Sequence, residues 1–267
     1  MRIHFISGLP RSGSTLLAAI LRQNPKCHAA MSSPLADIFR NVFRSMNTRN
    51  EFAVYMSEEQ RHRILEAVVR AYYADLDQTV VIFDTNRGWC GILPGLVRLF
   101  PDARVLCCVR SPAWILDSAE RYFQGNALQA SQTLGFDLSA TVYERVDALI
   151  KGNFLGSALN AFRQAWFGDH AKHLVTIRYD SLVERPAEIV ARLYALLGEE
   201  PVVHDFNNLA YDAPEFDARL GAPGFHRVAP RVEPKTRQTI LPPDLFEQHD
   251  CAFWDSPDRN PRNVIVW

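Results

Sequence analysis

Short apolar runs recur along the first two thirds of the chain, and they do not alternate between apolar and polar residues. Buried parallel strands have this pattern because helices cover both faces of their sheet. We therefore predict four parallel strands, which lie at residues 3–6, 80–83, 104–109 and 173–177.

Segments with apolar residues three or four positions apart separate these runs, as is typical of helices that bury one face. The predicted helices lie at 14–23, 34–46, 58–74, 91–100, 112–123, 141–151, 154–170 and 186–197. Ser57 and Gln60 form a capping-box pattern at the start of the third helix. The alternation of strands and helices predicts an α/β protein with a doubly wound sheet of at least four parallel strands flanked by helices.

The pattern changes after Glu200. Prolines and glycines become frequent between 201 and 243, and helical periodicity is weak. Aromatic residues nevertheless continue to the end of the chain, whereas disordered segments usually lack them. We therefore expect an α/β core at 1–200 and an irregular C-terminal segment at 201–267 of the same domain, wrapped over the core and covering a ligand site.

Composition narrows the class of protein. The net charge of −1 argues against a nucleic-acid binder, which usually shows a basic excess. No apolar run approaches the ~18 residues that span a bilayer. The first predicted strand begins at residue 3 and leaves no room for a signal peptide, so we expect a cytoplasmic enzyme. The five cysteines contain no C-x-x-C pair, which favours reduced thiols over a zinc site.

The first predicted strand leads into residues 8–15, GLPRSGST, and then into a helix. Gly8 and Gly13 let the backbone turn so that several N–H groups face one anion, and the helix adds its positive dipole end. The spacing is that of the phosphate-binding P-loop, except that Ser14 replaces its lysine. The basic residue is instead Arg11, inside the loop. The sheet is therefore predicted to be P-loop-like. The missing lysine favours a phosphate ligand other than ATP or GTP.

Polar residues follow each predicted strand directly: Ser7, Asp84, Arg110 and Tyr179. In open α/β sheets, ligands bind beyond the carboxyl ends of the strands, so we expect these residues at one edge. Ser118 lies two turns into the helix after Arg110. A guanidinium with a nearby hydroxyl suits a second phosphate.

Together these motifs resemble the sulfotransferases that use 3′-phosphoadenylyl sulfate (PAPS). The loop is very like the GVPRSGTT form that is typical of tyrosylprotein sulfotransferases. Arg110 and Ser118 have the eight-residue separation of the family's arginine and serine that hold the 3′-phosphate. Residues 179–186, YDSLVERP, resemble the family's YExLxxxP segment, whose tyrosine borders the nucleotide. The resemblance covers about residues 1–200 and implies transfer of a sulfuryl group from PAPS to a hydroxyl, with release of adenosine 3′,5′-bisphosphate.

The resemblance also implies the roles of individual residues. It assigns Arg110 and Ser118 to the 3′-phosphate of PAPS, and it places Tyr179 beside the nucleotide. Arg227, in the segment 224–231, is expected to lie over the co-substrate, and no metal is expected. The residues implied at the 5′ side are Arg11, Ser12, Gly13, Ser14 and Thr15.

The general base is where the chain departs from its relatives. Tyrosylprotein sulfotransferases carry a glutamate soon after the first helix, and residues 27–34 contain no carboxylate. Cytosolic sulfotransferases carry a histidine just after the second strand, where this chain has Asp84. We therefore take Asp84 as the first candidate for the base and His28 as the second. Arg87 would steady the transferring sulfonate, and Arg11 would stabilise the leaving phosphate.

Two other interpretations stay open at this point. Residues 80–84 also resemble the strand that ends in a Mg²⁺-binding aspartate in P-loop enzymes, so a nucleotide or small-molecule kinase using ATP and Mg²⁺ is the main alternative. The missing lysine at position 14 argues against it. A non-catalytic nucleotide-binding module is the third interpretation. The acceptor is open between a peptide or protein tyrosine and a small-molecule, sugar or lipid hydroxyl.

Overall fold

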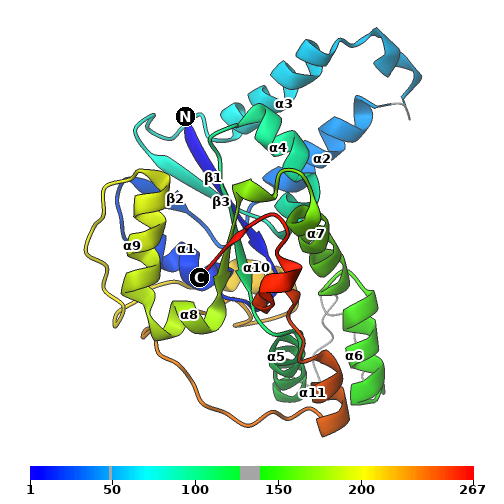
Figure 1. Ribbon diagram of the computed structural model, residues 1–267, viewed down its shortest axis with the longest axis vertical. Helices are drawn as coiled ribbons and strands as arrows, with labels where there is room; N and C mark the ends of the chain where they lie inside the picture. Colours follow the sequence, from blue (N-terminus) through cyan, green and yellow to red (C-terminus); the bar gives the residue numbers. More distant parts are fainter. Residues whose placement is uncertain (48–49, 127–138) are drawn as a thin grey trace.

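The protein is built around a six-stranded sheet with the strand order β2-β3-β1-β4-β5-β6. Helices lie on both sides of this sheet (Figure 1). This computed structural model describes residues 1–47, 50–126 and 139–267. Every neighbouring pair of strands is parallel, so all carboxyl ends lie at one edge. The strands are β1 (Arg2–Gly8), β2 (Cys27–Ala29), β3 (Val81–Thr85), β4 (Val105–Val109), β5 (Leu174–Arg178) and β6 (Ile265–Val266).

The four predicted strands are confirmed as β1, β3, β4 and β5, and the α/β class with a parallel sheet is confirmed with them. Strands β2 and β6 were not predicted, because runs of three and two residues are too short to show a pattern. Strand β6 comes from the end of the C-terminal segment and pairs with β5. That segment is therefore less irregular than expected.

The predicted helices are confirmed with ends that shift by a few residues, and the capping box of Ser57 and Gln60 is present. Short helices α8, α10 and α11 were not predicted. The helices that precede β5 are α1 (Ser14–Leu21), α2 (Leu35–Ser45), α3 (Glu58–Tyr72), α4 (Leu93–Leu99), α5 (Pro112–Gly125), α6 (Val142–Lys151) and α7 (Gly156–Phe167). Those that follow it are α8 (Tyr179–Glu184), α9 (Pro186–Leu197), α10 (Pro214–Arg219) and α11 (Pro243–His249).

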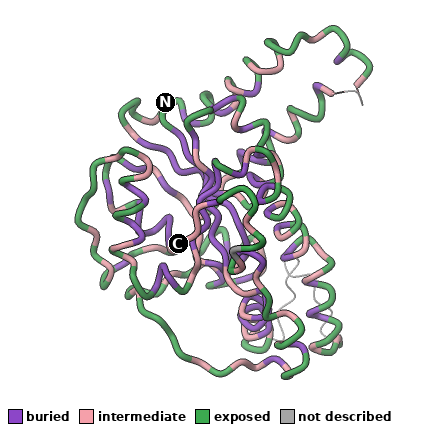
Figure 2. Tube along the Cα trace, in the orientation of Figure 1, coloured by how far each residue is buried: buried purple, intermediate pink, exposed green. Residues whose placement is uncertain are grey.

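The sheet separates two apolar cores. Helices α1, α8 and α9 pack on one face, and α2 to α7 pack on the other. Successive residues of β4 alternate between the cores: Cys107 belongs to the larger core, and Leu106 and Cys108 belong to the smaller one. Strands β1, β3, β4 and β5 are mostly buried, whereas the outer parts of α2 and α3 project from the sheet and are largely exposed (Figure 2). No helix among the described residues is long and apolar enough to cross a membrane.

The central strand β1 directs the chain toward the ligand-binding edge. Its last residue, Gly8, stands opposite Cys108 of β4 and has a φ of 104°. A Cβ atom there would lie 2.2 Å from the carbonyl oxygen of Cys108. The next residue, Leu9, donates its N–H to that same oxygen over 2.9 Å. Only glycine allows the backbone to approach β4 this closely and turn into the loop.

Candidate active site

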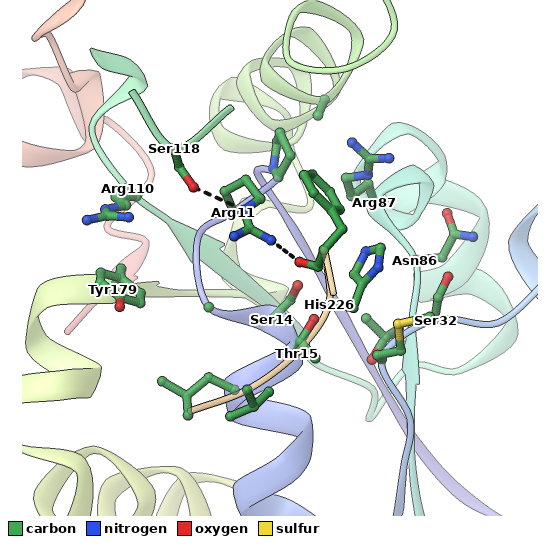
Figure 3. Close-up of a pocket in the computed structure, with 18 of the residues that line it drawn as sticks. Arg11, Ser14, Thr15, Ser32, Asn86, Arg87, Arg110, Ser118, Tyr179 and His226 are labelled. Atoms are coloured by element: carbon green, nitrogen blue, oxygen red, sulfur yellow. Dashed lines mark hydrogen bonds between the residues drawn. The ribbon is translucent and has the colours of Figure 1, made fainter. Parts of the chain in front are cut away.

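A cavity of about 1060 Å³ lies at the carboxyl ends of the strands (Figure 3). Its walls come from the loop after β1, the ends of β3 and β4, helices α5 and α7, and residues 216–237. Three predicted site residues, Ser12, Asp84 and His28, do not line it. The predicted residues that do line it are Arg11, Gly13, Ser14, Thr15, Arg87, Arg110, Ser118, Tyr179 and Arg227.

The loop after β1 has the geometry of an anion cradle. Arg11 and Gly13 both have positive φ angles, 56° and 92°, and Gly13 is the N-cap of α1. The first N–H groups of a helix have no partner within the helix, so those at the start of α1 are available to an anion. Ser12 is fully buried, and its hydroxyl donates to the carbonyl of Pro10 over 3.2 Å. Its side chain is therefore structural, and only its backbone belongs to the cradle.

Arg11 connects three parts of the site. Its Nε donates to the hydroxyl of Ser118 on α5 over 3.1 Å, and its guanidinium also donates to the carbonyl of Phe225 (Figure 3). The guanidinium lies 4.4 Å from the centre of the Phe225 ring. Burial, and next the charge of Arg110, lower the pKa of Arg11. Arginine remains charged in proteins, so this cation sits between the loop, α5 and the C-terminal segment.

Arg110, at the end of β4, forms a second cationic centre. Its guanidinium lies 4.3 Å from the centre of the Tyr179 ring and 5.9 Å from that of Trp114. Its Nε is buried and has no hydrogen-bond partner among the described residues. A buried donor without a partner is costly, which suits a position that an anionic ligand completes.

Arg237 adds a positive charge that the sequence patterns did not indicate. Its guanidinium lies 5.5 Å from the Trp114 ring and forms a 2.6 Å ion pair with the buried Asp117 of α5. Arg237 lines the same cavity as Arg110. Arg237 belongs to the C-terminal segment, and no motif or spacing in the sequence connects it with the other residues of the site.

Arg87 follows β3 and faces the cavity from the side opposite Arg110 (Figure 3). It donates from one terminal nitrogen to the carbonyl of Phe154 over 3.0 Å. Burial lowers the pKa of Arg87. Its location at the carboxyl end of β3 agrees with the prediction that several strands direct polar groups to one edge.

Asp84, the first candidate for the base, lies outside the cavity. It is 1% exposed and accepts hydrogen bonds from the indole of Trp89 (2.7 Å), the hydroxyl of Ser33 (2.6 Å) and the hydroxyl of Tyr73. Burial raises the pKa of Asp84, although these donors oppose the shift. A carboxylate enclosed by three donors and outside the cavity is not placed to receive a proton from an acceptor or to hold Mg²⁺ there.

His28, the second candidate for the base, lies in β2, and its ring packs edge-on against Tyr73 with centroids 5.6 Å apart. It does not line the cavity. The cavity does contain a histidine to which the sequence analysis assigned no role, His226. Its Nδ1 lies 2.6 Å from a carboxylate oxygen of the fully buried Asp217. The two residues are nine positions apart in the C-terminal segment, with no helical or strand spacing that would signal a pair.

Comparison with known proteins agrees with this architecture. The chain is 27% identical over 218 residues to the nodulation protein NoeE of Sinorhizobium fredii, an alignment that covers 74% of this chain and 50% of that protein. This chain therefore spans about half the length of the curated relative it matches.

A sulfotransferase domain from the curacin biosynthetic pathway has the same fold, with a TM-score of 0.51 and 16% identity. That similarity covers 92% of this chain and 89% of the other. A sequence model described as the sulfotransferase family matches residues 4–204, three quarters of the chain. The resemblance seen in the sequence is thus confirmed, and the chain belongs to the sulfotransferase family.

Proposed function

We propose that this protein transfers a sulfuryl group from PAPS to a hydroxyl group of an acceptor and releases adenosine 3′,5′-bisphosphate. The observation that carries the proposal is that two groups of residues suited to binding anions line one cavity. One is the loop with Ser14 and Thr15 at the start of α1, and the other is Arg110 with Ser118. PAPS carries phosphate groups on its 5′ and 3′ sides, and two separate groups of residues could each hold one of them. A linear triphosphate, as in ATP, would need only one such group.

The cradle at the start of α1 would hold the 5′ side of PAPS through backbone N–H groups and the hydroxyls of Ser14 and Thr15. Arg110 would hold the 3′-phosphate, since its buried Nε has no partner among the described residues and Tyr179 keeps its guanidinium in place. Arg227, which lines the cavity from the C-terminal segment, would lie over the nucleotide.

Arg11 and Arg87 would act on the transferring group. Sulfuryl transfer leaves negative charge on the bridging oxygen of the 5′-phosphate, and a buried guanidinium stabilises such charge strongly. Arg11 lies in the cradle and would act at that oxygen. Arg87 lies across the cavity and would steady the sulfonate. This chemistry uses side-chain cations and needs no metal.

The acceptor would enter beside α7, which contributes Ser157, Ala158 and Ala161 to the cavity wall, next to Phe154. These side chains are small or apolar, so they would position an acceptor by shape. We propose a hydroxyl-bearing acceptor without assigning its scaffold, since a peptide tyrosine and a sugar, lipid or other small-molecule hydroxyl present the same reacting atom.

The test is calorimetry of the purified protein with adenosine 3′,5′-bisphosphate, compared with ATP and Mg²⁺, in wild type and Arg110→Ala. The proposal expects binding of the bisphosphate in EDTA and a large loss in the variant. Binding of ATP with Mg²⁺ and indifference to the bisphosphate would instead identify a kinase. The replacement of the P-loop lysine by Ser14 argues against that outcome, because a kinase would lose its main contact to the β- and γ-phosphates.

A further inference from the structure

We propose that His226, oriented by Asp217, is the general base that removes the proton from the acceptor hydroxyl. The proposal rests on the proposed function, because it concerns the same cavity and the same reaction. Neither candidate from the sequence lines that cavity, whereas His226 does. In Figure 3 its imidazole lies among Ser14, Asn86 and Arg87, facing the space between the phosphate-binding loop and the end of β3.

The contacts of His226 set its tautomer. The Nδ1 atom lies 2.6 Å from Oδ1 of Asp217, and a carboxylate can only accept, so Nδ1 carries the proton and donates it. The other oxygen of Asp217 accepts the backbone N–H of His226 over 2.9 Å. The lone pair is therefore on Nε2, which has no hydrogen-bond partner among the described residues.

The pair is held rigidly. Asp217 is fully buried in α10, and its carbonyl accepts the N–H of Ala222 over 2.8 Å. The rings of Phe216 and Phe225 meet the imidazole edge-on, with centroids 5.4 and 5.1 Å away. Because the base is already fixed in one orientation, the reaction does not pay the entropic cost of ordering the imidazole.

The charges around His226 keep it ready to accept a proton. Burial is the largest influence and lowers the pKa of His226, and the cations Arg11 in the loop and Arg87 after β3 lower it further. Asp217 opposes them. The imidazole is therefore neutral at pH 7, and Asp217 stabilises the imidazolium once it forms.

Other proton acceptors in the cavity wall are less suited to this role. Asp37 is 65% exposed and paired with Arg40, and Glu233 is 47% exposed and paired with Arg231. Each of these carboxylates is already engaged by a neighbouring arginine. His226 differs because it is partly buried and its partner, the carboxylate of Asp217, is fully buried and hydrogen-bonded to it through both oxygens.

The proton and electron balance of the step is complete. The acceptor oxygen forms a bond to sulfur while its proton moves to Nε2 of His226. The bond between sulfur and the bridging oxygen of the 5′-phosphate breaks, and its electron pair stays on that oxygen beside Arg11. The imidazolium later gives its proton to solvent, and no oxidant or metal takes part.

The experiment compares His226→Gln and Asp217→Asn with the matched control His62→Gln, a substitution on the outer helix α3. Breakdown of PAPS is measured with 4-methylphenol, methyl glucoside, 1-octanol and water as acceptors. Calorimetry with adenosine 3′,5′-bisphosphate is run on the same samples. On the acceptor that wild type uses fastest, His226→Gln should lower kcat by about 10²-fold or more with unchanged affinity for the bisphosphate.

The pH profile separates a base from a structural residue. Wild type and His62→Gln should lose kcat on the acid side as His226 becomes protonated, and this loss should vanish in His226→Gln. In Asp217→Asn it should move to lower pH, because the anion that favours the imidazolium is gone. Unchanged kcat in His226→Gln with intact bisphosphate binding would overturn the assignment of His226 as the general base. No bisphosphate binding by wild type would instead overturn the proposed function.

A measurement on the wild type covers the case in which His226→Gln does not fold. Nitrogen-15 NMR of the imidazole should show Nδ1 protonated and Nε2 unprotonated at pH 7. Protonation of both nitrogens at that pH, or of Nε2 alone, would refute the assignment.

Discussion

The guanidinium of Arg11 donates from Nε to the hydroxyl of Ser118 over 3.1 Å, across 107 positions of sequence. This hydrogen bond joins the loop after β1 to α5. The two motifs that suggested separate phosphate subsites therefore line one cavity, together with Arg110. A ligand with two anionic groups can bridge them.

Arg11→Ala should lower kcat by about 10²- to 10³-fold, since it removes a cation from the proposed leaving phosphate. Arg11→Lys should recover part of this loss, because an ammonium keeps the charge but lacks the planar fork that reaches Ser118. The measurement is PAPS turnover at saturating acceptor. Arg63→Ala, on the exposed surface of α3, is the matched control and should leave kcat unchanged. Equal turnover in Arg11→Ala and wild type would rule out the role.

Tyr179→Ala should weaken binding of adenosine 3′,5′-bisphosphate by about 10-fold, since it removes the ring that lies 4.3 Å from the Arg110 guanidinium. Tyr179→Phe keeps the ring and should bind as wild type does. Calorimetry on the three proteins measures the difference. If Tyr179→Phe lost as much affinity as Tyr179→Ala, the hydroxyl of Tyr179, and not its ring, would be responsible for its contribution to bisphosphate binding.

Asp84→Asn should lower the free energy of unfolding by about 1–3 kcal/mol, because an amide nitrogen would face one of the donors Ser33, Tyr73 or Trp89. The folded variant should bind the bisphosphate normally and keep most of its kcat. Urea unfolding and turnover measure both effects, with the exposed Asp102→Asn as control. A large loss of kcat in a stable Asp84→Asn protein would restore this residue as a candidate base.

The stability of the protein should depend on His4 at mildly acidic pH. Burial, then the charges of Arg104 and Arg2, lower the pKa of His4 from 6.5 to about 4. Between pH 6.5 and pH 4, the His4 side chain is therefore mostly protonated in the unfolded chain and mostly neutral in the folded protein. The contribution of His4 to stability is present above pH 6.5 and is lost as the pH falls through this window, by roughly 3 kcal/mol in total.

The variant His4→Asn tests this dependence, because an amide oxygen can replace Nδ1 in accepting the N–H of Arg104, now 3.1 Å away. Urea unfolding from pH 7 to pH 4 should show a shallower loss of stability in His4→Asn than in wild type. The control His62→Asn, on α3, should follow the wild-type curve. Parallel curves for His4→Asn and wild type would contradict the prediction.

Most residues that line the cavity at the loop after β1 and at β4 could be predicted as neighbours, because their signals are local. A loop between a strand and a helix needs glycines at set positions, and Arg110 and Ser118 lie on one strand–helix unit. The edge at which these groups meet follows from the parallel sheet, which the apolar runs indicated. Strands of two or three residues, such as β6, leave no such signal.

The environments of the candidate bases, Asp84 and His226, could not be predicted, because they depend on contacts between distant segments. Asp84 follows a strand like any residue of the ligand-binding edge, and its neighbours Tyr73 and Trp89 enclose it only after the helices pack. His226 and Asp217 come together through a turn in a segment without periodicity. Periodic patterns report which face of an element is buried, whereas the environment of a single titratable group depends on which other elements cover it, and that follows from packing over the whole molecule.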